Sequence, residues 1–173
     1  MPDNIVLVGF MGSGKSTCGR ILAADLGWKF IDTDELIAAE AGMPVKEIFA
    51  RHSEVYFRAL EQETVARTVT FSRTVIATGG GVVLSPVNVQ HLRQGNKVVW
   101  LQVDLATALA RTRTTEERPL LQGQKPADIA RLWRHRQKYY QFADLWLNTA
   151  TMSPDEVAAA IKEALKQWLA ELK

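Results

Sequence analysis

A glycine-rich segment near the start of the chain has the residue types and the spacing that bind nucleotide phosphates. Residues 9–17 read GFMGSGKST, which matches the pattern G-x-x-x-x-G-K-[ST], and they directly follow the apolar run at residues 5–8. A strand before such a loop and a helix after it let the backbone N–H groups point inward at a phosphate. The alternative is a glycine-rich turn without a ligand. The predicted nucleotide-binding residues are Gly12, Ser13, Gly14, Lys15, Ser16 and Thr17.

Two side chains of this segment have predicted chemical roles. Lys15 can reach the β- and γ-phosphates of a nucleotide, where its charge would stabilise a transferring phosphoryl group, so it is a candidate catalytic residue. The hydroxyl of Ser16 is the expected protein ligand of Mg²⁺. These residues indicate a nucleotide substrate, but they do not identify the group that accepts the phosphate.

A pair of carboxylates follows the next apolar segment. Asp32 and Asp34 come directly after residues 28–31, which are apolar enough for a short strand. Ligands of open α/β sheets bind outside the carboxyl ends of the strands, so both carboxylates are expected at the same crevice as the phosphate-binding loop. Two residues apart on an extended chain, they would point the same way. The alternative is that Asp34 only caps the helix that follows.

The pattern of residues 35–69 is mostly helical, with breaks at residues 42–44 and 52–53, and this long insertion is a natural place to bind an acceptor. Arg58 and Glu61 lie three residues apart within it. Such spacing allows an ion pair that could hold the guanidinium ready for an anionic substrate. The alternative is an ordinary solvated helix face.

Two more segments are candidates for substrate contacts. Residues 79–81 are three consecutive glycines after a predicted buried strand at residues 74–78, which indicates either close approach of the backbone to a ligand or a flexible turn. Residues 111–125 lose the apolar periodicity of their surroundings, which favours a mobile lid. Arg118, inside this segment, could reach a transferring phosphoryl group.

The remaining segments complete the alternation of strands and helices that is typical of an α/β fold. Further strands are predicted at residues 97–103 and 145–147, and further helices at residues 86–93, 104–109 and 126–142. The apolar stripe of the last helix consists of Val157, Ile161, Leu165, Trp168 and Leu172.

The composition is that of a soluble globular protein with one domain. The chain has 173 residues, of which 47% are hydrophobic, and its 21 basic and 19 acidic residues give a net charge of +2. This balance gives no support to nucleic acid or a membrane surface as a partner, and no apolar run is long enough to span a membrane. The single cysteine, Cys18, is expected to pack in the core, which fits a reducing, cytoplasmic location.

Taken together, these motifs resemble the shikimate kinase family, within the nucleoside-monophosphate-kinase-like group of P-loop proteins. The resemblance spans almost the whole chain and includes the sequence RPLL at residues 118–121 and a basic residue ahead of Tyr139-Tyr140. It implies one domain over residues 1–173, with an acceptor-binding helical insertion at about residues 33–62 and a lid at about residues 111–125. The implied α/β fold has three layers, with a five-stranded parallel sheet in the order 2-3-1-4-5 and helices on both faces. The resemblance also implies a monomer.

The resemblance also implies a reaction, the transfer of the γ-phosphoryl group of ATP to the 3-hydroxyl of shikimate in chorismate and aromatic amino-acid biosynthesis, with Mg²⁺ as cofactor. Asp34 matches the residue that holds the substrate hydroxyls and is the candidate base. Asp32 matches the residue that helps hold Mg²⁺ beside Ser16. The implied ATP-binding residues outside the loop are Arg111, Pro154 and the lid residue Arg118, a further catalytic candidate. The implied substrate-binding residues are Asp34, Phe49, Phe57, Arg58, Gly79, Gly80, Gly81 and Arg136.

Two points stay open at the level of sequence. The segment after the second substrate arginine is one residue shorter than is usual in the family, so that arginine is Arg136 or, as the alternative, Arg134. A gluconate-kinase-like or nucleoside-monophosphate-kinase-like enzyme would share the loop and the sheet. A non-catalytic nucleotide-binding module would leave Asp34, Arg58 and Arg118 without a role.

Overall fold

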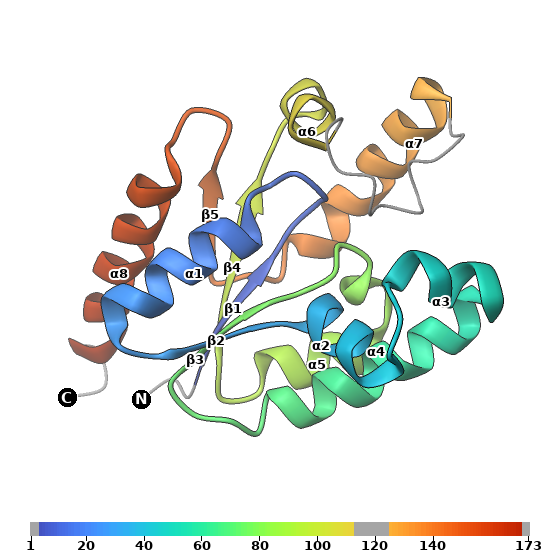
Figure 1. Ribbon diagram of the computed structural model, residues 1–173. Coiled ribbons are helices and arrows are strands. Elements are labelled where there is room, and N and C mark those ends of the chain that lie inside the picture. The colour runs from blue at the N-terminus through green and yellow to red at the C-terminus, as the bar shows by residue number, and fades with distance from the viewer. Residues whose placement is uncertain (1–3, 113–124, 171–173) are drawn as a thin grey trace.

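A parallel sheet of five strands forms the centre of the part of the chain that the computed structural model describes, residues 4–112 and 125–170 (Figure 1). The strand order is β2-β3-β1-β4-β5, with parallel pairing between neighbours, which confirms the predicted topology. The strands are β1 (Asn4–Val8), β2 (Lys29–Asp32), β3 (Thr74–Ala77), β4 (Lys97–Gln102) and β5 (Leu145–Asn148).

Helices cover both faces of the sheet and alternate with the strands along the chain (Figure 1). Two of them, α1 (Lys15–Leu26) and α8 (Pro154–Ala170), pack against each other on one face. The other described helices are α2 (Thr33–Ala41), α3 (Val45–Arg51), α4 (Glu54–Thr68), α5 (Pro86–Arg93), α6 (Leu105–Thr112) and α7 (Pro126–Gln137), with short 3₁₀ turns η1 (Val82–Leu84) and η2 (Lys138–Tyr140).

The strands at the centre of the sheet are buried because they are covered on both faces. β1 and β3 have no exposed residue, as expected for apolar strands of a parallel sheet between two layers of helices. Side chains alternate between the layers: Ile5 and Leu7 pack in the core cluster that includes α1 and α8, whereas Val6 and Val8 pack in the cluster that includes α4 and α5. This packing fixes the position of the carboxyl end of each strand, where the predicted site lies.

The helical segment after β2 has the predicted breaks. Gly42 ends α2 with a φ of 66°, a left-handed conformation that glycine adopts easily. Pro44 precedes α3, and the hydroxyl of Ser53 accepts a hydrogen bond from the N–H of Tyr56 at 3.1 Å at the start of α4. These local signals therefore fold the insertion into three short helices beside the carboxyl end of β3.

Three helix boundaries differ from the sequence prediction. α2 begins at Thr33, so Asp34 lies in the first helical turn rather than on extended chain. α6 continues to Thr112, because the Thr112 hydroxyl donates to the Ala108 carbonyl at 2.8 Å and so fits inside a helix. α7 ends at Gln137, where the tighter turn η2 takes over, rather than at residue 142.

Some predictions concern positions outside the described residues. Most of the predicted lid, residues 113–124 with Arg118, is among them, as is Leu172 of the last apolar stripe. Within the described residues, none of the helices is long and apolar enough to cross a membrane. Cys18 lies in the core beside α8, as predicted, and burial raises the pKa of its thiol.

Candidate active site

The phosphate-binding loop connects the end of β1 to the start of α1. Gly9, Gly12 and Gly14 have φ values of 149°, 75° and 90°, which side-chain-bearing residues rarely adopt. The loop is also packed closely: a Cβ atom on Gly9 would lie 2.5 Å from the carbonyl oxygen of Leu101, and one on Gly12 would lie 2.7 Å from that of Ala108. The glycines are therefore required both by conformation and by the contact of the loop with β4 and α6.

Lys15 is buried, and its ammonium group is held by oxygen atoms of the loop. Nζ donates to the carbonyl oxygens of Gly9 at 2.8 Å and Phe10 at 3.0 Å, and lies 3.4 Å from the hydroxyl of Ser13. The positive charge is thus placed at the loop itself, where a nucleotide would bring its phosphates.

Ser16 and Asp32 form the oxygen pair suited to a magnesium ion. The hydroxyl of Ser16 donates to Oδ2 of Asp32 at 2.5 Å. The other carboxylate oxygen of Asp32 accepts from the backbone N–H of Asp34 at 3.0 Å and of Glu35 at 3.4 Å, so Asp32 is the cap of α2. The capping role considered for Asp34 therefore belongs to Asp32, and Asp34 is left with its carboxylate on the first turn of the helix.

Hydroxyl and carboxylate oxygens are ligands that Mg²⁺ accepts, so the donor set of Ser16 and Asp32 fits this ion. The described residues contain no group of three or more His, Cys, Asp and Glu side chains arranged to hold a metal. That arrangement agrees with an ion bound through one or two protein oxygens together with substrate phosphates and water.

The triple-glycine turn after β3, residues 79–81, lies against the carboxylates of Asp34 and Glu61. A Cβ atom on Gly79 would lie 2.7 Å from Oδ1 of Asp34 and 3.2 Å from Oε1 of Glu61. The N–H of Gly79 also donates to the hydroxyl of Thr33 at 3.3 Å. A side chain at this position would displace a carboxylate, which explains why the chain has glycine here.

The predicted ion pair between Arg58 and Glu61 is present on α4. Nη1 of Arg58 donates to both carboxylate oxygens of Glu61, at 2.9 and 3.1 Å, and Nη2 donates to Glu54 at 3.1 Å. Glu61 is only 1% exposed, so the solvated-face alternative is wrong for this pair. Burial raises the pKa of Glu61, while the positive charge of Arg58 opposes that rise. A Cβ atom on Gly81 would lie 2.6 Å from Nη2 of Arg58, so the guanidinium rests directly on the turn.

Arg136 reaches the same turn from α7. Its side chain is buried, its Nε has no hydrogen-bond partner among the described residues, and Nη1 would lie 3.5 Å from a Cβ atom on Gly80. Burial lowers the pKa of Arg136, and the positive charge of Arg58 lowers it further. Arg134 differs: it is exposed and bonds to the carbonyl of Ala130 on its own helix.

Aromatic side chains border the acceptor side. Phe49 of α3 and Phe57 of α4 have ring centroids 4.8 Å apart, and both pack in the small core cluster that joins α2, α3 and α4. The guanidinium of Arg58 lies 5.4 Å from the ring centroid of Phe57. The two rings thus bring an apolar surface beside a charged group.

Of the two described residues predicted to border adenine, Arg111 contacts the phosphate loop. Arg111, at the end of α6, donates to the carbonyl of Gly12 at 3.2 Å and to the carbonyl of Thr149 at 2.8 Å. Pro154 is exposed and is the first residue of α8. Arg118 lies outside the described residues.

Two residues of the site were not singled out from the sequence. Tyr140 is buried, and its hydroxyl donates to the carbonyl of Gly80 at 2.7 Å, which ties η2 to the glycine turn. Its position four residues after Arg136 was the only sequence signal for it. Thr149 reaches the carbonyl of Ser13, and a single buried threonine gives no sequence signal of such a contact.

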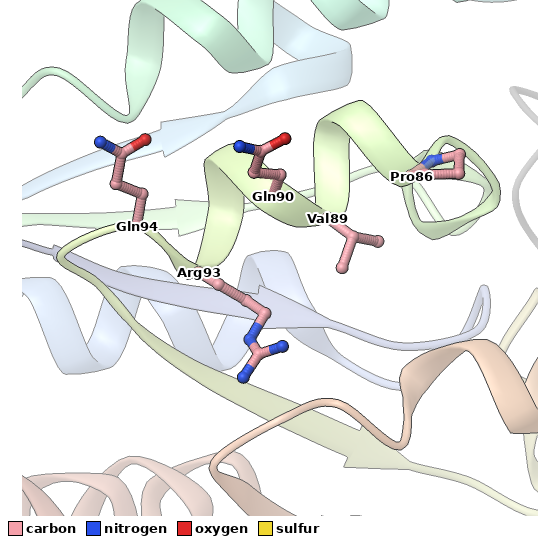
Figure 2. A pocket seen from close by; sticks show the side chains of 5 residues that line it. All are labelled: Pro86, Val89, Gln90, Arg93 and Gln94. Carbon is pink, nitrogen blue, oxygen red and sulfur yellow. The ribbon is translucent and has the colours of Figure 1, made fainter.

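A surface hollow of about 460 Å³ lies along α5, apart from these groups (Figure 2). It is lined by Pro86, Val89, Gln90, Arg93 and Gln94. None of these is a predicted site residue, and the lining contains no carboxylate. The hollow is therefore separate from the predicted site residues, which gather at the carboxyl ends of β1, β2 and β3.

Comparison with known proteins shows the family of the chain. The family model described as shikimate kinase matches residues 11–166. A shikimate kinase of Moorella thermoacetica is 59% identical over 172 residues, which cover 99% of this chain and 99% of that protein. A shikimate kinase of Thermosynechococcus vestitus is 46% identical, and the match covers 94% of this chain and 89% of that protein.

Solved structures give the same result at the level of the fold. The shikimate kinase from Acinetobacter baumannii in complex with shikimate has a TM-score of 0.91 and 34% sequence identity, covering 95% of this chain and 93% of that one. The shikimate kinase from Aquifex aeolicus has a TM-score of 0.83 and 32% identity, covering 94% of this chain and 96% of that one. With a family model matched over most of its length and a relative at 59% identity, the chain belongs to the shikimate kinase family.

Proposed function

We propose that this chain transfers the γ-phosphoryl group of ATP to the 3-hydroxyl of shikimate, a step of chorismate and aromatic amino-acid biosynthesis. The observation that supports it best is the position of Gly80 between the two halves of the site. A Cβ atom there would lie 3.4 Å from the carbonyl oxygen of Gly9 in the phosphate loop and 3.5 Å from Nη1 of Arg136. A small acceptor bound at this turn would therefore lie next to the phosphates of a nucleotide.

On the phosphate side, the backbone of the loop binds the phosphates and Lys15 moves from its loop oxygens to the β- and γ-phosphates. Ser16 and Asp32 hold Mg²⁺, which neutralises charge on the phosphates when it is bound. No covalent bond to the protein is needed, because phosphoryl transfer depends on position and charge stabilisation.

On the acceptor side, Asp34 takes the proton of the 3-hydroxyl of shikimate while the oxygen of that hydroxyl attacks the γ-phosphorus. The bond from the γ-phosphorus to the bridging oxygen breaks, and ADP leaves with its electron pair. Arg58 and Arg136 bind the carboxylate of shikimate, because the planar guanidinium forms two parallel hydrogen bonds with a carboxylate. Phe49 and Phe57 pack against the apolar side of the ring. The support for these roles is that four charged side chains meet at the glycine turn of residues 79–81: Asp34, Arg58, Glu61 and Arg136.

Further roles follow from the resemblance and belong to the same proposal. Arg118 stabilises the transferring group from a lid at about residues 111–125, while Arg111 and Pro154 border the adenine. We also infer that the enzyme acts as a monomer in the cytoplasm, on ATP and shikimate. The buried Cys18 is the support for a reducing compartment.

The test is an assay of ADP release with purified protein, Mg²⁺ and ATP, in which the acceptor is shikimate, gluconate or a nucleoside monophosphate. The proposal requires that shikimate alone supports steady release, and that phosphorus NMR of the product places the phosphate on the 3-oxygen. Equal release with gluconate, or release that does not depend on an acceptor, would contradict it. A phosphate on another oxygen would leave the substrate correct but would overturn the placement of the hydroxyl at Asp34.

A further inference from the structure

A buried threonine beyond the described site connects three parts of the nucleotide side. Thr149 follows β5 and is 2% exposed. Its hydroxyl lies 3.0 Å from the carbonyl oxygen of Ser13 in the phosphate loop and 3.0 Å from that of Gln102 at the end of β4. It also accepts from Nη1 of Arg111 at 3.3 Å, and its own N–H donates to the Gln102 carbonyl at 2.9 Å.

The contact with Ser13 acts on the direction of one backbone N–H group of the phosphate loop. In a trans peptide the carbonyl and the N–H point in opposite directions, so a group that holds the carbonyl of Ser13 also sets the direction of the N–H of Gly14. Gly14 has the left-handed φ of 90° and is the residue before α1, so nothing in its own side chain restrains this peptide. The hydrogen bond from Thr149 therefore restrains the Ser13–Gly14 peptide, which Gly14 itself does not restrain.

The rest of the loop shows why such a restraint is useful. The N–H of Ser13 is already used inside the loop, where it donates to the carbonyl of Phe10 at 3.2 Å. Gly9 and Gly12 are confined by contact with Leu101 and Ala108, which prevents movement in one direction only. Hydrogen bonds from Thr149 to the Ser13 carbonyl and from Arg111 to the Gly12 carbonyl add directional restraints on two peptides of the loop.

We propose that Thr149 is a positioning residue for the nucleotide phosphates: its hydroxyl fixes the Ser13–Gly14 peptide and orients Arg111, and through them it sets the affinity of the loop for polyphosphate. This inference rests on the proposed binding of ATP at the loop. A purely structural threonine would instead stabilise the fold without a selective effect on any ligand.

The test measures binding by calorimetry for ADP, inorganic tripolyphosphate and shikimate. Tripolyphosphate is included because it occupies the loop without an adenine. Thr149→Val removes the hydroxyl and keeps the shape, and Thr149→Ser keeps the hydroxyl. The matched control is Thr68→Val, which removes another buried threonine hydroxyl, bonded to the Val65 carbonyl at 3.2 Å on α4.

We expect Thr149→Val to weaken binding of both ADP and tripolyphosphate by about tenfold, because one buried hydrogen bond to the loop is lost. Binding of shikimate should stay within about twofold of the unaltered chain, and Thr149→Ser and Thr68→Val should bind all three ligands within about twofold. If Thr149→Val does not fold, Thr149→Cys replaces it, because the thiol is a weak donor of similar size.

Three results would overturn the inference. Unchanged binding of tripolyphosphate by Thr149→Val would show that the hydroxyl does not act on the loop, and equal weakening of all three ligands would show a general structural effect. The same loss in Thr149→Ser would show that the hydroxyl is not the active group. If the unaltered chain binds neither ADP nor tripolyphosphate, the proposed function itself fails, which is a separate and recognisable outcome.

Discussion

The two halves of the site are built in different ways. The phosphate side, residues 9–17 with Asp32, is mostly a continuous stretch of backbone, and its conformation depends on three left-handed glycines. The acceptor side, which we define as Asp34, Arg58, Glu61, Arg136 and the glycine turn 79–81, collects charged side chains from α2, α4 and α7.

This difference decides what each half tolerates. A backbone site survives most changes of neighbouring side chains, because its donors are N–H groups present in every residue except proline. A side-chain site depends on the balance of its charges, because each buried charge needs an opposite charge or a hydrogen-bond partner. We therefore expect changes on the phosphate side to affect nucleotide binding and turnover, and changes on the acceptor side, apart from the candidate base Asp34, to affect the binding of shikimate selectively.

The largest effect is expected for Lys15→Ala. Loss of the charge directed at the phosphates should lower kcat by about 10³-fold, while binding of shikimate should change little because the ammonium group of Lys15 is held at the phosphate loop, by Gly9, Phe10 and Ser13. Steady-state kinetics and a shikimate titration measure the two quantities, and thermal unfolding verifies the fold. Turnover near that of the unaltered chain would remove the loop from the mechanism.

Asp34→Asn should have the next largest effect. It separates position from role, because Asp34 belongs to the acceptor side but is proposed to act in the chemical step. The amide keeps the shape of the side chain and loses its ability to accept a proton, so kcat should fall by about 10²-fold while the affinity for shikimate falls much less. Kinetics at saturating ATP separate kcat from KM. A loss confined to affinity would show that Asp34 only binds hydroxyls.

Gly81→Ala tests the close contact between the turn and Arg58. The new methyl group would lie 2.6 Å from Nη2 of Arg58, so the guanidinium, which is bonded to Glu61, must shift. We expect about tenfold weaker binding of shikimate, an effect of the size of one lost charged hydrogen bond, with unchanged binding of ATP. A glycine of positive φ, such as Gly27 at 63°, would not be a matched control, because alanine there would strain the backbone, which is not the case at Gly81.

Alkylation of Cys18 should give the smallest effect. Burial raises the pKa of this thiol, so less thiolate is present at a given pH than in an unfolded chain. Native protein treated with iodoacetamide near pH 8 should remain unmodified by mass spectrometry, and denatured protein should gain one adduct. Rapid modification of the native chain would show that α1, directly after the phosphate loop, opens more than its packing suggests.

The sequence predicted the phosphate side well because that side is local. The pattern at residues 9–17, the strand before it and the helix after it are all neighbours in the chain, and the predicted order of strands was confirmed. The alternative considered for Asp34 is wrong: Asp32, and not Asp34, caps α2, because the helix begins at Thr33, two residues before the helical pattern predicted from residue 35.

The acceptor side could be predicted only in part, because packing between distant elements determines it. Arg134 and Arg136 lie on one basic helix about 200° apart around its axis, and no local pattern says which of them turns inward. The structure shows Arg136 buried at the glycine turn and Arg134 exposed. Tyr140 was part of the family resemblance, but its contact in the site was not predicted for the same reason, since its bond to Gly80 joins residues 60 positions apart.

The placement of the acceptor beside Arg136 is tested most directly by comparing Arg136→Ala with Arg134→Ala, the same change at two positions of one helix. We expect Arg136→Ala to weaken shikimate binding by about 2 to 5 kcal/mol and to leave ATP binding nearly unchanged. Arg134→Ala should bind both ligands normally. Calorimetric titration of each variant with shikimate and with ATP, in separate experiments, gives all four values. Normal shikimate binding by Arg136→Ala, with weakened binding by Arg134→Ala, would contradict the placement of the acceptor at the Gly80 turn.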